Sequence, residues 1–540
     1  MPSARTCAPD RSYASGVQSA APRNGVTLAE LLAAFSLATD LGLGQPMEHL
    51  LRAWRIADLL GRQVGLSDDD QAALFFVAVL SWVGCVADTP EVASWFGDDI
   101  AFRSDSFGVD FAGLPALTFM LGHAGVGHPA LHRLGRTSAL LATRGKGIER
   151  GLLSHCLSTS VLADRLGLGA PVAHAVRQFF TRWDGTGVPA GVAGEEIALT
   201  VRLFHLADVA EVFARRGDAD AAVAVARARR GTKFDPALVD AFRAVAHDVL
   251  AEVADGPDFQ DMISTHPLLQ RRLDGPALDA ALEALADFTD LRSAFRAGHS
   301  RAVAALAARA AGLAGLSATE VDAVRAAGLL HDIGLHGVPA TVLDKPGPLT
   351  ATESERMRVH AYYTERVLAR PAALARIGAI AALTHERLDG SGYHRGLGGA
   401  ALPTTARILA AADAYQAMRE PRPYRPAMTA ATAAAALRAD VRRCRLAADA
   451  VDAVLTAAGD APSRRHTGPA GLTPREVEVL ALIARGATTR QVASRLGIAA
   501  KTAGTHIERI YTKTGASTRS TATLFAVQHG LLDTLAPLEP

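Results

Sequence analysis

An internal repeat constrains the fold of this 540-residue chain more than any other feature of its sequence. Residues 183–194 (Trp-Asp-Gly-Thr-Gly-Val-Pro-Ala-Gly-Val-Ala-Gly) match residues 388–399 (Leu-Asp-Gly-Ser-Gly-Tyr-His-Arg-Gly-Leu-Gly-Gly) at an offset of 205. Nearer the N-terminus the offset becomes 250, where His49 matches His299. Self-similarity at a fixed offset is the signature of a duplicated structural unit. The sequence therefore predicts two copies of one domain.

The two copies are predicted to span residues 27–250 and 276–460. The change of offset from 250 to 205 means that the first copy carries 45 extra residues, between Gly84 and His155. The remaining parts are a tail at 1–26, a linker at 461–471 that contains Pro and Gly, and a short module at 472–532. The chain is thus expected to hold two related domains and one smaller one.

The hydrophobic pattern predicts an all-α fold. Apolar residues recur with a spacing of 3.6, and the alternation that marks strands is almost absent. A chain rich in Ala and poor in aromatic residues also favours helices. Four Ser/Thr-x-x-Glu signatures predict helix starts with a capping box. These signatures are Thr27/Glu30, Ser317/Glu320, Thr350/Glu353 and Thr473/Glu476.

Charge and cysteine content exclude several classes of protein. The net charge of the chain is only +1, so a nucleic-acid site must be local. The four cysteines are scattered and form no Cys-x-x-Cys, which argues against a disulfide framework and fits a reducing cytoplasm. The apolar run at about 72–87 is too short to span a bilayer comfortably. We therefore expect a cytoplasmic protein without a membrane partner.

The most informative chemistry lies in Leu330-His331-Asp332-Ile333-Gly334. An adjacent His-Asp pair presents an imidazole and a carboxylate at one point of the backbone, and the carboxylate can bridge two metals. The same segment of the second copy contains four more candidate ligands, namely His299, His360, His385 and Asp413. The first copy has Ser81-Trp82 in place of His-Asp and Phe180 in place of His385, so we expect it to be metal-free.

The second copy resembles the HD-GYP branch of HD-domain phosphohydrolases over about 180 residues. The resemblance rests on an ordered set of motifs: Gly298-His299-Ser300, His331-Asp-Ile-Gly334, Lys345-Pro-Gly-Pro-Leu-Thr350, His360, His385-Glu386, Asp389-Gly-Ser-Gly-Tyr393, Ala412-Asp413 and Arg422-Pro-Tyr-Arg425. It implies an all-helical domain whose metals bind a phosphodiester, typically cyclic di-GMP, and an attacking hydroxide. The first copy is then a degenerate domain of the same type.

The resemblance also implies a role for each matching residue. His299, His331, Asp332 and Asp413 would form the basic metal set, with His331 and Asp332 at the catalytic centre. Asp332 would bridge to a second metal held by His360 and His385, at a separation of about 3.5–4 Å. Tyr393 would stack on or hydrogen-bond to the ligand, and Arg422 and Arg425 would bind its phosphates. We expect iron or manganese in preference to zinc.

The second copy departs from the family pattern at five positions. Leu335 replaces the usual Lys after His-Asp-Ile-Gly, which removes a phosphate contact. Thr384 replaces the first His of a His-His pair, so one metal is predicted to bind tightly and the second weakly. His394 stands in place of the Pro of Gly-Tyr-Pro, and Gln416 at a polar position after Asp413. Phe295 replaces the Glu that some members use for a third metal, so a third metal is not expected.

Residues 472–532 resemble a LuxR-type helix-turn-helix over their whole length. The matching residues are Leu472-Thr-Pro-Arg-Glu476, Val479-Leu480, Ala484-Arg-Gly486, Val492-Ala493, Leu496-Gly-Ile498, Lys501-Thr502, His506, Ile510, Lys513 and Gly515. The module has eight Lys or Arg against three Glu, a net charge of +5. Gly497 would form the tight turn, and the helix at about 499–514 would lie in the major groove.

The resemblance assigns the contacts of this helix to double-stranded DNA. Lys501, Thr502, Arg509 and Lys513 are candidates for phosphate contacts, while Thr505 and Glu508 would face the bases. A homodimer would match the two-fold symmetry of such DNA sites.

Two hypotheses follow from the sequence. The first is a transcriptional regulator whose second domain is a metal-dependent phosphodiesterase for a cyclic dinucleotide. The second is a non-catalytic transcription factor whose HD-GYP-like domain only senses a nucleotide or a phosphorylated ligand. Leu335 and Thr384 favour the second hypothesis, and the complete set of His299, His331, Asp332 and Asp413 favours the first.

Overall fold

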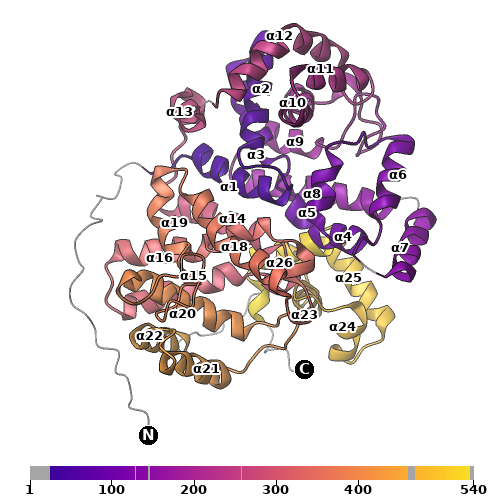
Figure 1. Cartoon of the computed structure of the whole chain (residues 1–540). Coiled ribbons are helices and arrows are strands. Elements are labelled where there is room, and N and C mark those ends of the chain that lie inside the picture. The colour runs from indigo at the N-terminus through magenta and orange to yellow at the C-terminus, as the bar shows by residue number, and fades with distance from the viewer. Residues whose placement is uncertain (1–24, 128, 144–145, 257, 460–468, 535–540) are drawn as a thin grey trace.

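The computed structural model describes residues 25–127, 129–143, 146–256, 258–459 and 469–534 (Figure 1). Within these ranges the chain is helical, and β-structure is limited to isolated bridges such as Phe180–Val188. The all-α prediction is confirmed. In Figure 1 the first copy (indigo to magenta) lies above the second (orange), and the C-terminal helices (yellow) lie beside both.

The helices of the first copy and the segment after it run as follows: α1 (Leu28–Gly42), α2 (His49–Gln63), α3 (Asp68–Leu80), α4 (Cys85–Phe96), α5 (Asp99–Ser106), α6 (Gly113–His123), α7 (Ala130–Thr143), α8 (Lys146–Arg165), α9 (Ala170–Arg177), α10 (Leu199–Arg216), α11 (Ala219–Ala228), α12 (Pro236–Ala254) and α13 (Phe259–Thr265). Those of the second copy are α14 (Gly275–Asp290), α15 (His299–Leu313), α16 (Ala318–Leu330), α17 (Ala340–Leu343), α18 (Ala351–Leu368), α19 (Ala375–Ala381), α20 (Thr404–Arg419), α21 (Ala430–Arg442) and α22 (Ala448–Gly459). Short 3₁₀ helices join them, including η3 (Ala294–Arg296) and η4 (Ile333–Gly337).

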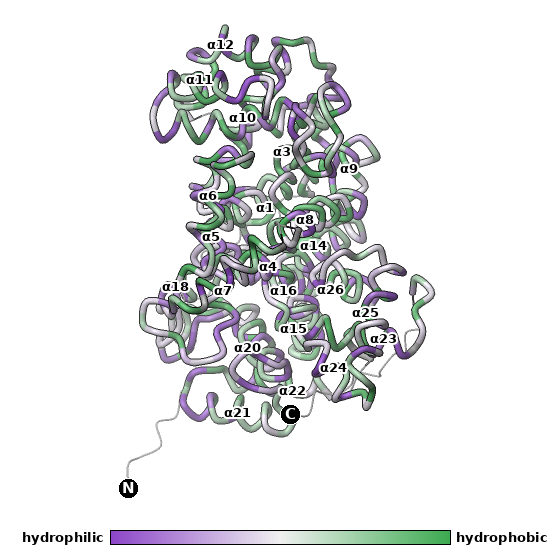
Figure 2. Tube along the Cα trace, turned by 90° about the vertical axis from the view of Figure 1, so that its right-hand side faces the viewer, coloured by the Kyte–Doolittle hydropathy of each residue, from purple (hydrophilic) through white to green (hydrophobic). Residues whose placement is uncertain are grey.

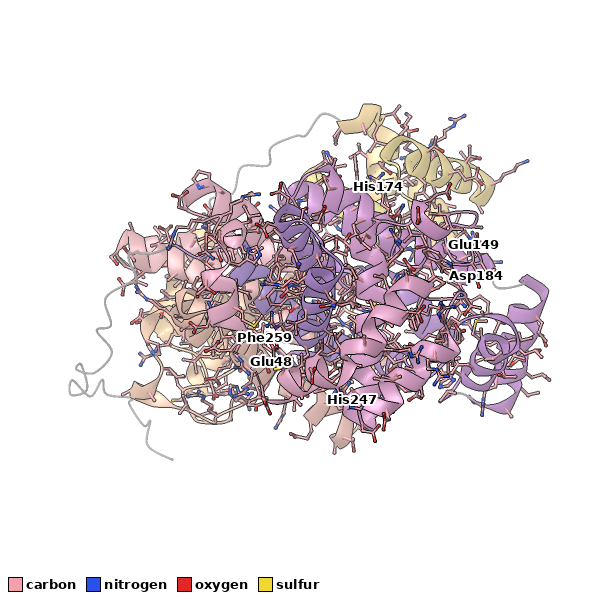
Figure 3. The ribbon with its side chains drawn as sticks, turned by 90° about the horizontal axis from the view of Figure 1, so that it is seen from above. Glu48, Glu149, His174, Asp184, His247 and Phe259 are labelled. Atoms are coloured by element: carbon pink, nitrogen blue, oxygen red, sulfur yellow. The ribbon has the colours of Figure 1, made fainter. Side chains whose placement is uncertain are left out.

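The repeat found in the sequence is present in the structure. Helices α2 and α3 correspond to α15 and α16 at the offset of 250, with the same first and last positions. Helices α8, α9 and α10 correspond to α18, α19 and α20, whose first residues lie 205 positions later. Even the Asp-Gly-Thr/Ser-Gly turns agree, since Asp184 (labelled in Figure 3) accepts bonds from Thr186 as Asp389 does from Ser391.

The extra residues of the first copy form helices of their own. Helices α5, α6 and α7 lie between α4 and α8, in the interval where the sequence places the insertion. The corresponding interval of the second copy contains only η4 and the four-residue α17. The insertion is therefore an added helical cover on the first copy, and it lies where the second copy has its metal-ligand turn.

The two copies share one hydrophobic core. Residues from α1 to α22 belong to a single buried cluster, and α1 packs on η4 and α18 of the other copy. Figure 2 shows apolar stretches along the helices at the centre of the molecule. One stretch, Asp68–Phe96, is long and apolar enough to cross a membrane, but 89% of its apolar window is buried in the protein. It is a core helix.

Capping confirms the predicted helix starts. Thr27, Ser317, Thr350 and Thr473 each accept a hydrogen bond from the backbone of the Glu three residues later, and that Glu binds back to the cap. Such caps satisfy backbone N–H groups that the first turn leaves free. The four helices therefore begin at residues that can be read from the sequence.

The C-terminal module packs against both copies. Its helices are α23 (Pro474–Ala484), α24 (Thr489–Leu496), α25 (Ala500–Thr514) and α26 (Arg519–Gln528), which enclose a small core of their own. Helix α26 contacts α4 and α14, and Leu524 joins the main core. Ser154 of α8 and Thr518 share a buried hydrogen bond of 2.8 Å. The module is thus docked on the two copies through α26.

Candidate metal centre and DNA-binding surface

Four of the predicted metal ligands meet at one point of the second copy. His299 opens α15, His331 and Asp332 follow α16, and Asp413 lies in α20. The Nε2 atom of His299 is 3.3 Å from Asp413 Oδ1 and 3.7 Å from Asp332 Oδ2. The Nε2 atom of His331 is 3.1 Å from Asp332 Oδ2 and 3.6 Å from Asp413 Oδ1. These separations suit ligands that surround one cation.

A second group of ligands adjoins the first through Asp332. His360 of α18 places Nε2 at 3.8 Å from Asp332 Oδ1, and His385 places Nδ1 at 3.9 Å from Asp413 Oδ2. One ligand atom each from Asp332, His360 and His385 lies within 4.8 Å of the others, as is also true of His299, His331 and Asp332. Asp332 is shared by both groups, the arrangement that a bridging carboxylate requires.

Several polar atoms at this centre are buried and have no hydrogen-bond partner among the described residues. They are His299 Nε2, His331 Nε2 and His360 Nε2. Buried polar atoms normally have a partner, because leaving one unsatisfied costs roughly 1–3 kcal/mol. All three belong to imidazoles of the two ligand groups that share Asp332. The residues present therefore fit a divalent metal.

Outer hydrogen bonds fix the orientation of three imidazoles. The Nδ1 atom of His299 lies 2.8 Å from Glu420 Oε2, and those of His331 and His360 lie 2.8 and 2.5 Å from the carbonyls of Gly328 and Met357. An N–H donated outward leaves Nε2 free to bind a metal. The sequence analysis missed Glu420. Its signal was its place seven residues after Asp413, directly after the end of α20.

The electrostatics of the site favour neutral His331, His360 and His385 and an ionised Asp413, whereas Glu420 raises the pKa of His299 although burial opposes this. Burial lowers the pKa of His360 to about 4 and that of His385 well below its usual value. Burial alone would raise the pKa of Asp413, but hydrogen bonds from His299 and His331 hold that pKa well below its usual range. Neutral imidazoles and ionised carboxylates are the forms that bind metals.

Glycine is required where the His-Asp turn meets α18. A Cβ atom on Gly334 would lie 2.0 Å from the carbonyl oxygen of His360, so no side chain fits there. Thr364 stabilises the same contact, because its hydroxyl donates to the His331 carbonyl at 3.0 Å and accepts from the Gly334 N–H at 3.1 Å. Gly84 repeats this contact against His155 in the first copy. This close packing places His360 beside Asp332.

Arg296 is a charged group at the centre that the sequence analysis did not identify. Its guanidinium forms an ion pair with Asp332 Oδ2, the oxygen that faces His299 and His331. Arg296 belongs to η3, three residues before His299. A guanidinium at this oxygen repels a second cation and occupies a ligand.

We therefore expect Arg296→Ala to bind divalent metal about tenfold more tightly than the unmodified chain, because it removes a competing positive charge. Metal titration of the full chain followed by competition with a chelator measures the difference. Arg356→Ala, which removes an exposed arginine of α18, is the matched control and should leave the affinity unchanged. Equal affinities for Arg296→Ala and the control would show that Arg296 does not compete with metal.

A cavity of about 270 Å³ opens next to the metal ligands. Tyr393 and Arg422, two of the predicted substrate-binding residues, lie in its wall, and the Tyr393 ring stacks on His385 with centroids 4.9 Å apart. Lys345 and Leu335 also line it. The remaining lining includes Phe295, Arg296, Pro423 and Tyr424. The cavity therefore combines cations with aromatic rings beside the metal ligands.

Arg425 does not lie with these residues, contrary to its predicted role as a phosphate ligand. Its guanidinium donates to the carbonyls of Ala417, Met418, Glu420 and Pro426. These bonds close the loop after α20, so Arg425 positions the neighbouring Arg422. The sequence could not separate the two arginines, because both belong to the same four-residue motif.

In the first copy, aromatic residues stand at positions that correspond to metal ligands of the second. His49 Nε2 lies 3.1 Å from Asp208 Oδ1, as His299 does from Asp413 in the second copy. Trp82, at the position of Asp332, donates its indole N–H to Asp208 at 3.3 Å. His155 Nε2 lies 2.6 Å from the Ser81 carbonyl, and Phe180 packs against its ring. Aromatic rings thus fill the place of the ligands.

One group in the first copy has metal-ligand chemistry that the sequence analysis missed. Cys85, Asp88 and His155 place one ligand atom each within 4.8 Å of one another. Arg103, however, donates to Asp88 Oδ1 at 2.5 Å and to the Cys85 carbonyl at 2.9 Å. The guanidinium supplies positive charge at this group, so we still expect the first copy to be metal-free.

The helix-turn-helix geometry agrees with the predicted turns. Gly497 adopts φ 63° between α24 and α25, a conformation that favours glycine, and Thr488 caps α24. Of the predicted DNA contacts, those exposed on α25 without a side-chain ion pair among the described residues are Lys501, Thr502, Thr505, Glu508 and Arg509. Exposed Arg490 and Arg495 of α24 add further positive charge.

Lys513 is also on α25 but is engaged within the module. Its ammonium lies 2.7 Å from Glu476 and 3.0 Å from the Gly471 carbonyl. The same Glu476 caps α23, so Lys513 ties the recognition helix to the first helix of the module. We therefore assign it a structural role, in place of the predicted phosphate contact.

Comparisons with known proteins agree with these two sites. Residues 283–448 match the family described as HD domain, and residues 470–526 match the bacterial regulatory proteins of the luxR family. The first match contains His299, His331 and Asp332, together with the other candidate metal ligands. The second contains α25.

Similarity to individual proteins reaches beyond these two matches. The 3'3'-cGAMP-specific phosphodiesterase 3 of Vibrio cholerae is 29% identical over 414 residues, which cover 74% of this chain and 88% of that protein. A cyclic di-GMP phosphodiesterase of Thermotoga maritima is 40% identical over 145 residues, 26% of this chain and 39% of that protein. A crystal structure of a cyclic GMP-AMP specific phosphodiesterase of V. cholerae superposes with a TM-score of 0.55 and 27% identity, over 81% of this chain and 99% of that one.

Proposed function

We propose that this chain, which carries an HD domain and a C-terminal luxR-type regulatory domain, is a DNA-binding regulator whose second copy is a metal-dependent phosphodiesterase for a cyclic dinucleotide. The observation that carries the proposal is the pair of ligand groups that share Asp332, in which three buried imidazole nitrogens have no hydrogen-bond partner among the described residues. The relatives named above act, by their names, on 3'3'-cGAMP or cyclic di-GMP. We expect such a protein to be in the cytoplasm, because its proposed substrate and its DNA target are there.

The metal-binding residues divide into two sets around Asp332. His299, His331 and Asp413 would hold one metal with Asp332, and His360 and His385 would hold a second, for which iron or manganese is expected. When bound, divalent metals polarise a phosphoryl oxygen and lower the pKa of a bound water. Glu420 keeps His299 turned toward the centre through its 2.8 Å contact with Nδ1. The protein thus supplies a rigid set of ligands.

The cavity beside the metal ligands supplies contacts for the rest of the substrate. Arg422 and Lys345 line this cavity and would meet the phosphates of a cyclic dinucleotide, although Arg422 also contacts Glu420 at 3.2 Å and Lys345 contacts Glu353 at 2.6 Å. Tyr393 and Tyr424 offer rings on which its bases can stack. The Tyr393 ring is held against His385, so a base stacked there would lie next to the second group of metal ligands. Base stacking and metal-dependent hydrolysis would therefore take place at the same wall of the cavity.

The sensor alternative is favoured by specific residues of the same site. Arg296 pairs with Asp332, Thr384 donates to the Ala381 carbonyl at 2.8 Å and offers no imidazole, and Leu335 is buried in a small apolar cluster with Val338 and Val342. Each feature weakens the second metal or a phosphate contact. A chain of this kind would bind the dinucleotide and change its DNA affinity without cleaving the ligand.

Thr384→His tests the proposal. An imidazole at this position adds a ligand to the weaker metal group, so we expect roughly tenfold tighter binding of the second metal and faster turnover. Metal content per chain and hydrolysis of 3'3'-cGAMP and cyclic di-GMP measure both effects. Thr384 is only 1% exposed, so a larger side chain at this position also changes the packing. Thr384→Leu is therefore the control, because leucine is about as bulky as histidine but has no ligand atom. If both variants bind metal like the unmodified chain, the assignment of the second group is wrong.

A further inference from the structure

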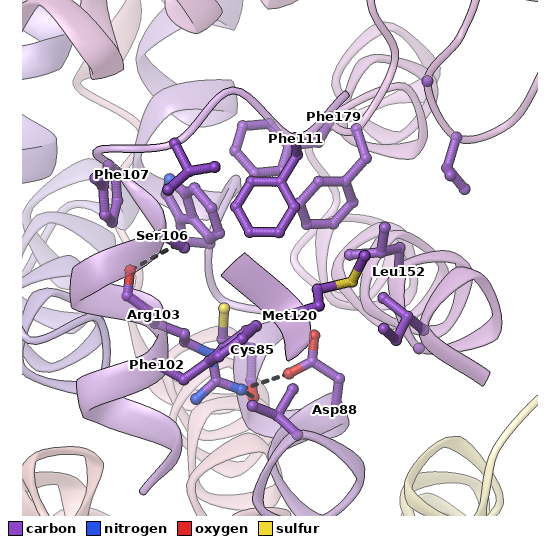
Figure 4. Close-up of a pocket in the computed structure, with 18 of the residues that line it drawn as sticks. Cys85, Asp88, Phe102, Arg103, Ser106, Phe107, Phe111, Met120, Leu152 and Phe179 are labelled. Atoms are coloured by element: carbon purple, nitrogen blue, oxygen red, sulfur yellow. Dashed lines mark hydrogen bonds and ion pairs between the residues drawn. The ribbon is translucent and has the colours of Figure 1, made fainter. Parts of the chain in front are cut away.

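The first copy contains a cavity of about 250 Å³ that the proposed function does not use. Figure 4 shows it between α4, the inserted helices and the Phe179 segment. Its walls come from the position of the lost metal site (Trp82, Phe180, Asp208) and from the insertion. The 45 extra residues of the first copy therefore form part of the wall of this cavity, next to the positions that correspond to the metal ligands of the second copy.

Aromatic side chains are concentrated around this cavity. The chain has 18 Phe and 4 Trp, and eight of these residues line this one cavity. They are Trp82, Trp95, Phe96, Phe102, Phe107, Phe111, Phe179 and Phe180. Met120, Leu152 and Ile148 complete the apolar surface. Concave apolar sites with a few polar groups are the usual form of small-molecule pockets.

The wall of the cavity contains one ammonium group, that of Lys233, which is not paired with a carboxylate among the described residues. Lys233 lies in the wall, and no hydrogen bond or ion pair of its ammonium is recorded among the described residues. Nearby Asp208 contacts His49 and Trp82, and Asp110 forms an ion pair of 2.5 Å with Arg182. Burial and the positive charges of Arg229 and Arg182 lower the pKa of Lys233 to about 8. The ammonium is still charged at neutral pH.

Two other acidic residues of the lining, Asp88 and Glu91, have their negative charge paired or reduced. Asp88 is paired with Arg103 at 2.5 Å, as the dashed line in Figure 4 shows. Burial raises the pKa of Glu91 to about 7, so this carboxyl group carries less negative charge near neutral pH than an ordinary carboxyl group. Because the charge of the cavity is concentrated at Lys233, a ligand with a single negative charge fits better than a cation or a polyanion.

We propose that this cavity binds a small carboxylic acid with an aromatic or acyl body, the body lying among the phenylalanine and tryptophan rings and the carboxylate lying on Lys233. The assignment goes beyond the proposed phosphodiesterase and DNA-binding activities, and it uses neither the metal ligands nor α25. A cyclic dinucleotide has two phosphates, whereas two of the three cationic residues in this lining, Arg103 and Arg182, are already paired with Asp88 and Asp110.

A buried glycine offers a way to close the cavity without disturbing the fold. Gly151 of α8 lines the cavity, and a Cβ atom built on it would meet nothing within 4 Å. Gly151→Leu therefore extends into open space, and leucine also favours the helix more than glycine does. Lys233→Met removes the ammonium while keeping the length of the side chain. Lys345→Met makes the same charge change in the second copy and is the control.

The test is calorimetric titration of the full chain with 1-naphthylacetate and with the uncharged 2-(1-naphthyl)ethanol. We expect one acid per chain, with the alcohol at least tenfold weaker. Lys233→Met should weaken binding of the acid until it equals binding of the alcohol. Gly151→Leu should abolish binding of both compounds, and Lys345→Met should leave both affinities unchanged. Failure of the unmodified chain to bind the acid, equal binding of acid and alcohol, or binding that survives in a folded Gly151→Leu variant would overturn the proposal. Binding of 3'3'-cGAMP that is lost in Gly151→Leu would overturn it as well. None of these outcomes depends on metal or DNA.

Discussion

Asp332→Ala is expected to remove divalent metal from the protein and to abolish phosphodiesterase activity. Asp332 is the one residue common to both ligand groups, and its oxygens lie 3.1 Å from His331 and 3.8 Å from His360. Its loss should cost more than the roughly 10–100-fold that follows loss of an outer hydrogen-bond partner. Because the first copy has Trp82 in the corresponding place, no other site should retain metal.

Metal analysis of the purified variant after dialysis, together with its rate of hydrolysis, measures this result. Asp322→Ala is the matched control, since Asp322 is an exposed aspartate on α16, ten residues before Asp332. The control should keep both metal and rate. If Asp332→Ala retains stoichiometric metal, either the first copy binds it, for which Cys85, Asp88 and His155 are the candidates, or the ligand set is wrong.

The second large effect is expected on DNA. Replacing both Lys501 and Arg509 by Ala should weaken binding to duplexes of every sequence, because these exposed side chains of α25 have no competing acidic partner among the described residues. Loss of about two phosphate contacts should reduce the slope of log affinity against log salt by about 2. The affinity itself should fall roughly tenfold or more at moderate salt.

Salt-dependent titration of labelled duplexes with the full chain provides the measurement. Arg309→Ala combined with Arg376→Ala makes the same change of net charge on exposed helices of the second copy and should leave the slope unchanged. An equal loss of slope in both double variants would mean that only overall charge matters. In that case α25 would not be the DNA-binding helix.

Much of this architecture could be predicted because the sequence records it twice. The offsets of 250 and 205 identify equivalent helices, and four capping boxes mark where helices start. The candidate ligands came from the resemblance to HD-GYP proteins, and the repeat adds that His299 and His360 have His49 and His155 at the matching positions of the first copy. A repeated pattern shows which positions correspond, and a difference between the copies shows where the chemistry changed.

Other features could not be predicted because they depend on contacts between distant segments. Arg296 lies 36 residues before Asp332, and nothing in its local pattern indicates that it pairs with that carboxylate. Arg425 and Lys513 carry the expected charge, yet the fold gives them acceptors inside the protein. The aromatic cavity depends on where the inserted helices fold back, which hydrophobic periodicity does not specify.

The rate at which the metal-loaded full chain converts 3'3'-cGAMP to its linear product tests the central claim most directly. We expect slow turnover that increases with added manganese or iron, because the second ligand group has only His360, His385 and the shared Asp332. The turnover should be absent in Asp332→Ala. A chain that binds metal through Asp332 and binds the dinucleotide, but leaves it intact at every metal concentration, would contradict a phosphodiesterase and establish the sensor.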